Sequence, residues 1–214
     1  METKTFTVAL EKNPVITIEV IPGHFATSNA HTNNYLDVGG LKSNSKVARN
    51  VARELAIPYL SSTLIDTIVC MEKTDVIGAY LAEELLQAGN SVINSDSEIH
   101  VLAPAYNAGG KMIFQDNVVE WIRNRNIIVL SATIASGQTI EAALECFAYY
   151  GGRVAGISTL FYSSRYKTEE NVHALFSSED IPGYKLFNIG ECEMCRAGQK
   201  LDAIINSEGY TIIG

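Results

Sequence analysis

Short apolar segments that resemble buried β-strands alternate along this chain with segments that have helical periodicity. The strand-like segments are rich in Val and Ile and cover residues 15–21, 67–71, 99–103, 127–130 and 154–161. Helix-length segments separate the later ones, and strands joined in this way pair in parallel through right-handed crossovers. We therefore predict an α/β protein with a doubly wound, mainly parallel sheet.

The chain of 214 residues suits a single domain, which we predict over residues 1–214. Residues 1–45 are expected to form a strand, a turn at Pro22-Gly23 and then a long irregular polar segment, and such segments are often functional. Residues 46–190 are assigned to the α/β core, with a last strand at 184–188, and residues 191–214 to a tail.

Charge and hydropathy exclude several classes of partner. The net charge of −8 argues against nucleic-acid binding, which depends on basic patches. No apolar run is long enough to span a bilayer, and the N-terminus lacks the apolar segment of a secretory signal, so we expect a cytoplasmic protein without membrane contact. A small anionic ligand stays compatible with this charge, because backbone amides can bind phosphate.

A loop of small residues at 131–138 joins the best buried strand, 127–130, to a helix that begins near Ile140. Small residues let the backbone approach a ligand, and the amides of a helix N-terminus favour an anion. An ordinary strand–loop–helix connection capped by a hydroxyl group is the alternative interpretation. The candidate phosphate-binding residues are Ala135, Ser136, Gly137, Gln138 and Thr139.

A polar quartet, Glu72, Lys73, Thr74 and Asp75, follows the strand at 67–71. Because the carboxyl ends of parallel strands meet at one edge of a sheet, we expect this quartet to face the same pocket as the small-residue loop. Glu72 and Asp75 offer carboxylates to a metal; alternatively, Asp75 caps the helix that follows.

The segment 127–139 resembles the phosphoribosyl-pyrophosphate motif of type I phosphoribosyltransferases, an apolar strand leading into a Thr/Ser/Gly-rich loop and a helix. The likeness runs patchily over residues 24–200 and is strongest to orotate phosphoribosyltransferases. SNAHTNNYLD at 28–37 is similar to their N-terminal hood, the quartet at 72–75 corresponds in place to their pyrophosphate loop, and CEMCRAGQKLD resembles a CxxCxxG tail seen in some of them.

The resemblance implies a phosphoribosyltransferase fold with a hood and a 5′-phosphoribosyl ligand. It also implies Mg²⁺ bound with phosphoribosyl pyrophosphate, pyrimidine nucleotide formation from orotate, and a homodimer. Carried over by position, it assigns the ribose side to Ser131 and Thr133, the pyrophosphate side to the quartet, and a catalytic role to Lys111. The base would contact Tyr35, His31 and Phe161.

The chain departs from the family pattern where an acidic pair should hold the ribose hydroxyls. Ser131 and Ala132 stand there, and one serine hydroxyl does not replace two carboxylates as acceptors. The loop at 103–115 also contains a single basic residue, Lys111, that could neutralise the charge of the departing pyrophosphate. A second hypothesis is therefore a non-catalytic nucleotide-binding or regulatory protein of the same fold.

Cys192 and Cys195 form a CxxC pair, which supplies two of the four ligands of a closed zinc site. Cys70 and Cys146 lie far upstream in apolar segments and are expected to be buried thiols, and no pair of histidines is expected nearby. We therefore predict no zinc site within one chain. A zinc ion shared across a dimer, a redox pair and a tight turn that packs the tail stay open.

Overall fold

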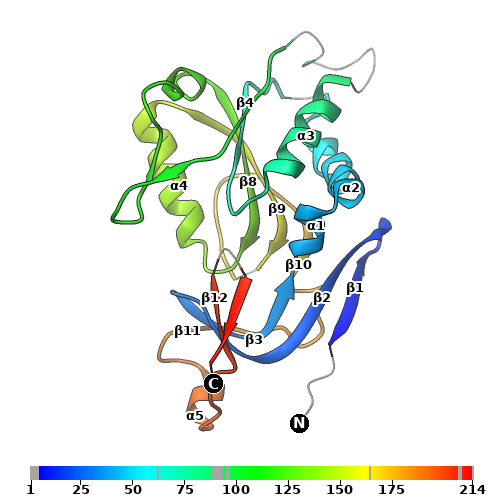
Figure 1. Ribbon diagram of the computed structural model, residues 1–214, viewed down its shortest axis with the longest axis vertical. Coiled ribbons are helices and arrows are strands. Elements are labelled where there is room, and N and C mark those ends of the chain that lie inside the picture. Colours follow the sequence, from blue (N-terminus) through cyan, green and yellow to red (C-terminus); the bar gives the residue numbers. More distant parts are fainter. Residues whose placement is uncertain are drawn as a thin grey trace.

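The computed structural model describes residues 5–61, 63–87, 94, 97–163, 165–206 and 209–213. Its core sheet has five strands in the order β10-β9-β8-β4-β5, all parallel (Figure 1). This confirms the predicted α/β class and the mainly parallel sheet. The strands are β4 (Thr67–Cys70), β5 (His100–Leu102), β8 (Asn126–Ile134), β9 (Arg153–Tyr162) and β10 (Val172–Ser177).

Helices cover both faces of the core sheet. The helices α2 (Ser45–Ala56) and α3 (Asp75–Gln87) pack on one face and α4 (Gln138–Tyr150) on the other (Figure 1). Successive side chains of a strand point to opposite faces of the sheet. Ile128 and Leu130 of β8 therefore pack in the hydrophobic core beneath α2 and α3, and Ile127 and Val129 pack in the core beneath α4. The continuous apolar run at 127–130 thus reflects a strand that is buried on both sides.

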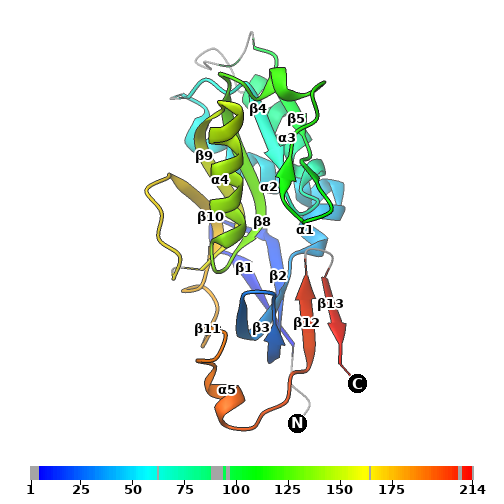
Figure 2. The same cartoon turned by 90° about the vertical axis from the view of Figure 1, so that its left-hand side faces the viewer.

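A second sheet, here called the hood sheet, lies below the core in both views (Figures 1 and 2). Its strand order is β11-β3-β2-β12-β13, and β1 pairs with β2. The strands are β1 (Phe6–Leu10), β2 (Asn13–Ala26), β3 (Ala30–Asp37), β11 (Leu186–Asn188), β12 (Ala203–Asn206) and β13 (Gly209–Ile212).

Two expectations about the N-terminal segment are wrong. The strand β2 continues through Pro22-Gly23 with only a register shift, so no turn forms there. Residues 24–45 are not irregular, because β3 and α1 (Gly39–Ser43) occupy most of them. The polar composition hid β3, since its buried face carries Thr32 and Asn34, whose side chains are hydrogen-bonded.

Both ends of the chain build the hood. The strand predicted at 184–188 is β11, but it pairs antiparallel with β3 in the hood sheet. The predicted tail adds β12, parallel to β2, and β13, antiparallel to β12. The remaining elements are η1 (Ile57–Tyr59), the hairpin of β6 (Ala105–Tyr106) and β7 (Met112–Ile113), η2 (Val119–Trp121) and α5 (Glu193–Arg196).

Within the described part of the chain, the helices are too short or too polar to cross a lipid bilayer.

Candidate functional site

A cleft of about 960 Å³ brings the carboxyl ends of β4 and β8 together with residues of the hood. Ligands of open α/β sheets bind at this edge. The loops after β4 and β8 and the start of α4 form the core side of the cleft. The hood side is lined by Thr27, Ser28, Asn29, Thr32, Asn34, Tyr35, Leu36, Asp37, Ile205, Asn206 and Tyr210.

Residues 135–137 of the small-residue loop expected at 131–138 form a loop that lies in this cleft, whereas residues 131–134 belong to β8 and Gln138 begins α4. Ala135, Ser136, Gly137 and Thr139 line the cleft, but Gln138 does not. Gly137 is the N-cap residue of α4, with φ of +84°, and no described side chain caps the helix there. The first-turn amides of α4 are therefore available to an anion in the cleft, with the helix dipole in support.

Tyr166 packs directly against Gly137 and adds a second reason for glycine at this position. A Cβ atom on residue 137 would lie 2.0 Å from Cδ2 of the Tyr166 ring. That ring is only 7% exposed and belongs to the core beneath α4. The shape of the loop thus depends on a left-handed backbone conformation and on the absence of a side chain.

Glu72 supplies a carboxylate to the end of β8. Its Oε2 accepts hydrogen bonds from the Ser131 hydroxyl at 2.9 Å and from the backbone amides of Ala132 and Thr133 at 2.9 and 3.0 Å. Ser131 and Ala132 stand where the family motif has its acidic pair, and both are hydrogen-bonded to an acidic side chain from the neighbouring loop. Thr133 and Ala132 line the cleft, while Ser131 is buried and does not.

The loop that carries Glu72 has an unusual backbone. Glu72 and Lys73 have φ values of +54° and +61°, which cost roughly 1–2 kcal/mol per residue for side chains other than glycine. The Nζ of Lys42 donates to the Glu72 carbonyl at 2.9 Å, and buried Thr74 donates its hydroxyl to Met71 and Leu130 carbonyls. Such strain persists where surrounding contacts enforce it, and it is frequent at functional sites.

The charged groups of the cleft differ from those expected. Lys111 does not line it, although its neighbour Gly110 does. Lys73 lines the cleft, and so does Lys42 of α1, which the sequence did not indicate because its segment is polar and lacks hydrophobic periodicity. Together with Asp37, Glu72 and Asp75, the described lining therefore carries three carboxylates and two ammonium groups.

Of the three residues predicted to contact a base, Tyr35 and Phe161 line the cleft and His31 does not. Tyr35 is partly buried and its ring lies 4.8 Å from that of Tyr210. Burial, with Asp37 and Tyr210 nearby, raises the pKa of Tyr35, so its hydroxyl stays protonated. Phe161 is 1% exposed and therefore offers little surface for stacking.

Tyr184 is a further cleft residue that the sequence did not single out. Its ring contacts that of Phe161 at 5.2 Å. Burial raises the pKa of Tyr184 to about 12, although a hydrogen bond with Thr32 acts in the opposite direction. The phenol is consequently neutral at physiological pH and able to donate a hydrogen bond.

Known proteins were compared with the chain by sequence and by shape. No family model and no curated protein matches the sequence. Among solved structures, adenine phosphoribosyltransferase from Thermoanaerobacter pseudethanolicus matches with a TM-score of 0.50 and 16% identity, covering 67% of this chain and 88% of that one. Orotate phosphoribosyltransferase from Mycobacterium tuberculosis H37Rv matches with a TM-score of 0.51 and 13% identity, covering 75% and 90%.

UMP synthase from Leishmania donovani also matches, with a TM-score of 0.51 and 17% identity. The match covers 70% of this chain but 31% of the synthase. The chain therefore has the α/β fold of the phosphoribosyltransferases. More particularly, it is the type I phosphoribosyltransferase fold, as the resemblance at 127–139 predicted.

Proposed function

We propose that the chain binds a 5′-phosphoribosyl compound in this cleft and transfers the phosphoribosyl group of phosphoribosyl pyrophosphate to a base. By resemblance the base is orotate and the product a pyrimidine nucleotide. The observation that carries the proposal is the Glu72 carboxylate, which is hydrogen-bonded to the end of β8 beside the small-residue loop. It supplies a negative acceptor for ribose hydroxyls where the sequence motif has none.

Each part of the ligand has a matching set of residues in the cleft. The 5′-phosphate would contact the amides and hydroxyls of residues 135–139, and the ribose would lie beside Glu72 and Thr133. The diphosphate would lie toward Lys73 and Lys42. In the reaction a base nitrogen bonds to ribose C1′ while the bond from C1′ to the diphosphate oxygen breaks. Pyrophosphate leaves with both electrons of that bond, and the proton of the base nitrogen passes to the pyrophosphate.

The charges of the cleft fit a divalent cation. Three carboxylates against two ammonium groups leave the described lining acidic, and a diphosphate would add further negative charge. Mg²⁺ is usually held by one or two carboxylates together with substrate phosphates, so a dedicated cage is unnecessary. Glu72 and Asp75 would hold it, and it would neutralise charge on the leaving diphosphate.

A non-catalytic nucleotide-binding protein is the second candidate, and one observation favours it. Lys111, the expected cation of the loop at 103–115, lies outside the cleft lining. If no other group meets the charge of departing pyrophosphate, a nucleoside monophosphate would bind without turnover. The homodimer and the cytoplasmic location inferred from the sequence stay predictions.

Calorimetric titration tests the proposed function. Phosphoribosyl pyrophosphate is expected to bind at least tenfold more tightly with Mg²⁺ than without it, since the cation offsets repulsion from the acidic lining. Addition of orotate should then release pyrophosphate. Tight binding of a nucleoside monophosphate with no pyrophosphate release would favour the non-catalytic alternative. No heat with either ligand would contradict both.

A further inference from the structure

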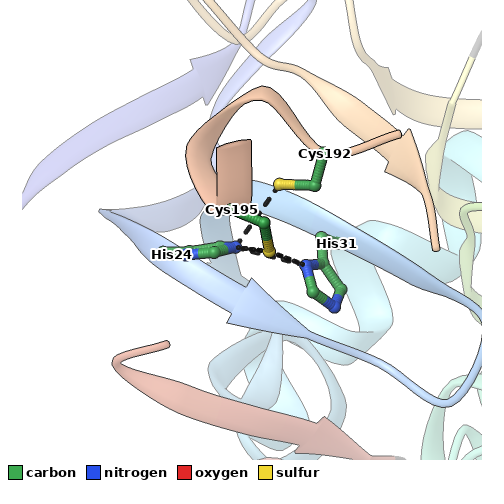
Figure 3. Close-up of side chains that lie close together, drawn as sticks. All are labelled: His24, His31, Cys192 and Cys195. Atoms are coloured by element: carbon green, nitrogen blue, oxygen red, sulfur yellow. Dashed lines mark hydrogen bonds between the residues drawn. The ribbon is translucent and has the colours of Figure 1, made fainter. Parts of the chain in front are cut away.

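Four side chains with metal-binding atoms converge at the end of the hood that points away from the core. They are His24 of β2, His31 of β3, and Cys192 and Cys195 at α5 (Figure 3). Their ligand atoms all lie within 4.8 Å of one another. The expectation that no histidine pair lies near the CxxC is therefore wrong. A hairpin that the sequence did not reveal brings both rings to it.

Four of the six distances between these ligand atoms match those of a tetrahedral coordination shell. With bonds of about 2.0 Å to nitrogen and 2.3 Å to sulfur, a tetrahedral zinc ion separates two nitrogens by about 3.3 Å and a nitrogen from a sulfur by about 3.5 Å. His24 Nε2 lies 3.2 Å from His31 Nδ1, 3.4 Å from Cys192 Sγ and 3.6 Å from Cys195 Sγ. His31 Nδ1 lies 3.3 Å from Cys195 Sγ.

His24 is held in the tautomer that a metal ligand requires. Its Nδ1 lies 3.0 and 3.2 Å from the carbonyl oxygens of Gln199 and Lys200. A carbonyl only accepts, so Nδ1 carries the proton and Nε2 directs its lone pair at the two sulfurs and His31. Carbonyl partners on the second ring nitrogen are the usual support of metal-bound histidines.

We propose that His24, His31, Cys192 and Cys195 form a structural zinc site. Two thiolates and two imidazoles make a closed tetrahedral set, which suits zinc in a structural role rather than a catalytic one. His24 and Cys192 are fully buried, and both thiols belong to free cysteines. The site lies apart from the cleft and stands independently of the proposed function.

Such an ion would join two segments that are distant in the sequence. His24 and His31 belong to the β2–β3 hairpin and the two thiols to the turn of α5. The segment that follows α5 returns to β2, where the amide of His24 donates to Asp202 at 2.7 Å and the amide of Asp202 donates to the His24 carbonyl at 2.8 Å. Zinc would therefore fix the tail onto the hood, beside β12.

Metal analysis of the full chain tests the site. We expect about one zinc atom per chain after purification. Replacement of zinc by Co²⁺ should give a thiolate-to-cobalt charge-transfer band and the visible bands of a tetrahedral site. Chelation should lower the thermal unfolding temperature. A metal-free chain that binds neither Zn²⁺ nor Co²⁺, or one with a Cys192–Cys195 disulfide as purified, would overturn the proposal.

Variants assign the ion to these residues. Cys195→Ser changes an exposed position and should weaken zinc affinity, measured against a chromophoric chelator, by more than tenfold, because even partners outside the coordination shell are worth about 10–100-fold. Cys146→Ser, at a thiol that donates to the Met112 carbonyl, is the matched control and should keep full affinity. Equal affinity in both variants would exclude Cys195 as a ligand and contradict the proposal.

Discussion

Glu72→Ala is expected to weaken binding of Mg²⁺ and phosphoribosyl pyrophosphate by roughly 100-fold, close to 3 kcal/mol. The substitution removes the acceptor of three hydrogen bonds from residues 131–133 and one of the carboxylates that line the cleft. It also frees a loop whose backbone is held in left-handed conformations at Glu72 and Lys73. Calorimetry on the purified variant measures the loss directly.

Glu72→Gln separates the two effects of that substitution. A glutamine oxygen can still accept from the amides of Ala132 and Thr133, so the loop should keep its shape and its stability. The affinity for Mg²⁺ and phosphoribosyl pyrophosphate should nevertheless be at least tenfold lower than that of the unsubstituted chain, because the negative charge of the carboxylate is lost. Glu145→Gln, on the exposed surface of α4, is the control for loss of a carboxylate. Full affinity in Glu72→Gln would show that Glu72 only shapes the loop.

Gly137→Ala is expected to destabilise the chain by about 2–5 kcal/mol. A left-handed conformation disfavours a side chain by about 1–2 kcal/mol, and forcing a methyl group into packed structure adds about 1–3 kcal/mol. The new Cβ would lie 2.0 Å from the Tyr166 ring, so the ring and the small-residue loop would both have to move. Phosphate affinity should therefore fall as well. Denaturant unfolding and phosphate titration measure the two losses.

Gly183→Ala is the matched control for the packing contribution. Gly183 has φ of +70°, close to the +84° of Gly137, but a Cβ there would meet no atom within 4 Å. This variant should lose only the conformational contribution of about 1–2 kcal/mol and keep its affinity for phosphate. Equal destabilisation by the two substitutions would show that Tyr166 does not restrict residue 137.

The central strands β4, β8 and β9 of the core sheet could be predicted from the sequence because they are largely buried and form continuous apolar runs, as at 127–130. The edge strand β10, which is mostly half-buried, was not predicted. The hood sheet could be predicted only in part: strands were expected at 15–21 and 184–188, which belong to β2 and β11. The strand β3 was missed because it buries polar residues such as Thr32 and Asn34, and the full length of β2 was missed because the strand passes through a Pro-Gly pair that is typical of turns. A hydrogen-bonded polar residue on a buried face leaves no hydrophobic periodicity to detect.

The part of the candidate site that could be predicted lies next to the strands that could be predicted. The loops after β4 and β8 follow recognisable strands, so residues 72–75 and 135–139 could be expected at one sheet edge. The bond between Glu72 and the end of β8 joins residues about 60 positions apart and depends on side-chain direction, which no local pattern records. The histidines near the CxxC were missed because the hairpin that carries them was missed.

A crystal structure of the chain with ribose 5-phosphate tests the central claim most directly. We expect the phosphate to accept hydrogen bonds from backbone amides of residues 135–139 and the ribose hydroxyls to lie within hydrogen-bonding distance of Glu72. A phosphate bound elsewhere, or an empty cleft at saturating ligand, would contradict the proposed site. A ribose turned away from Glu72 would contradict the role proposed for that carboxylate.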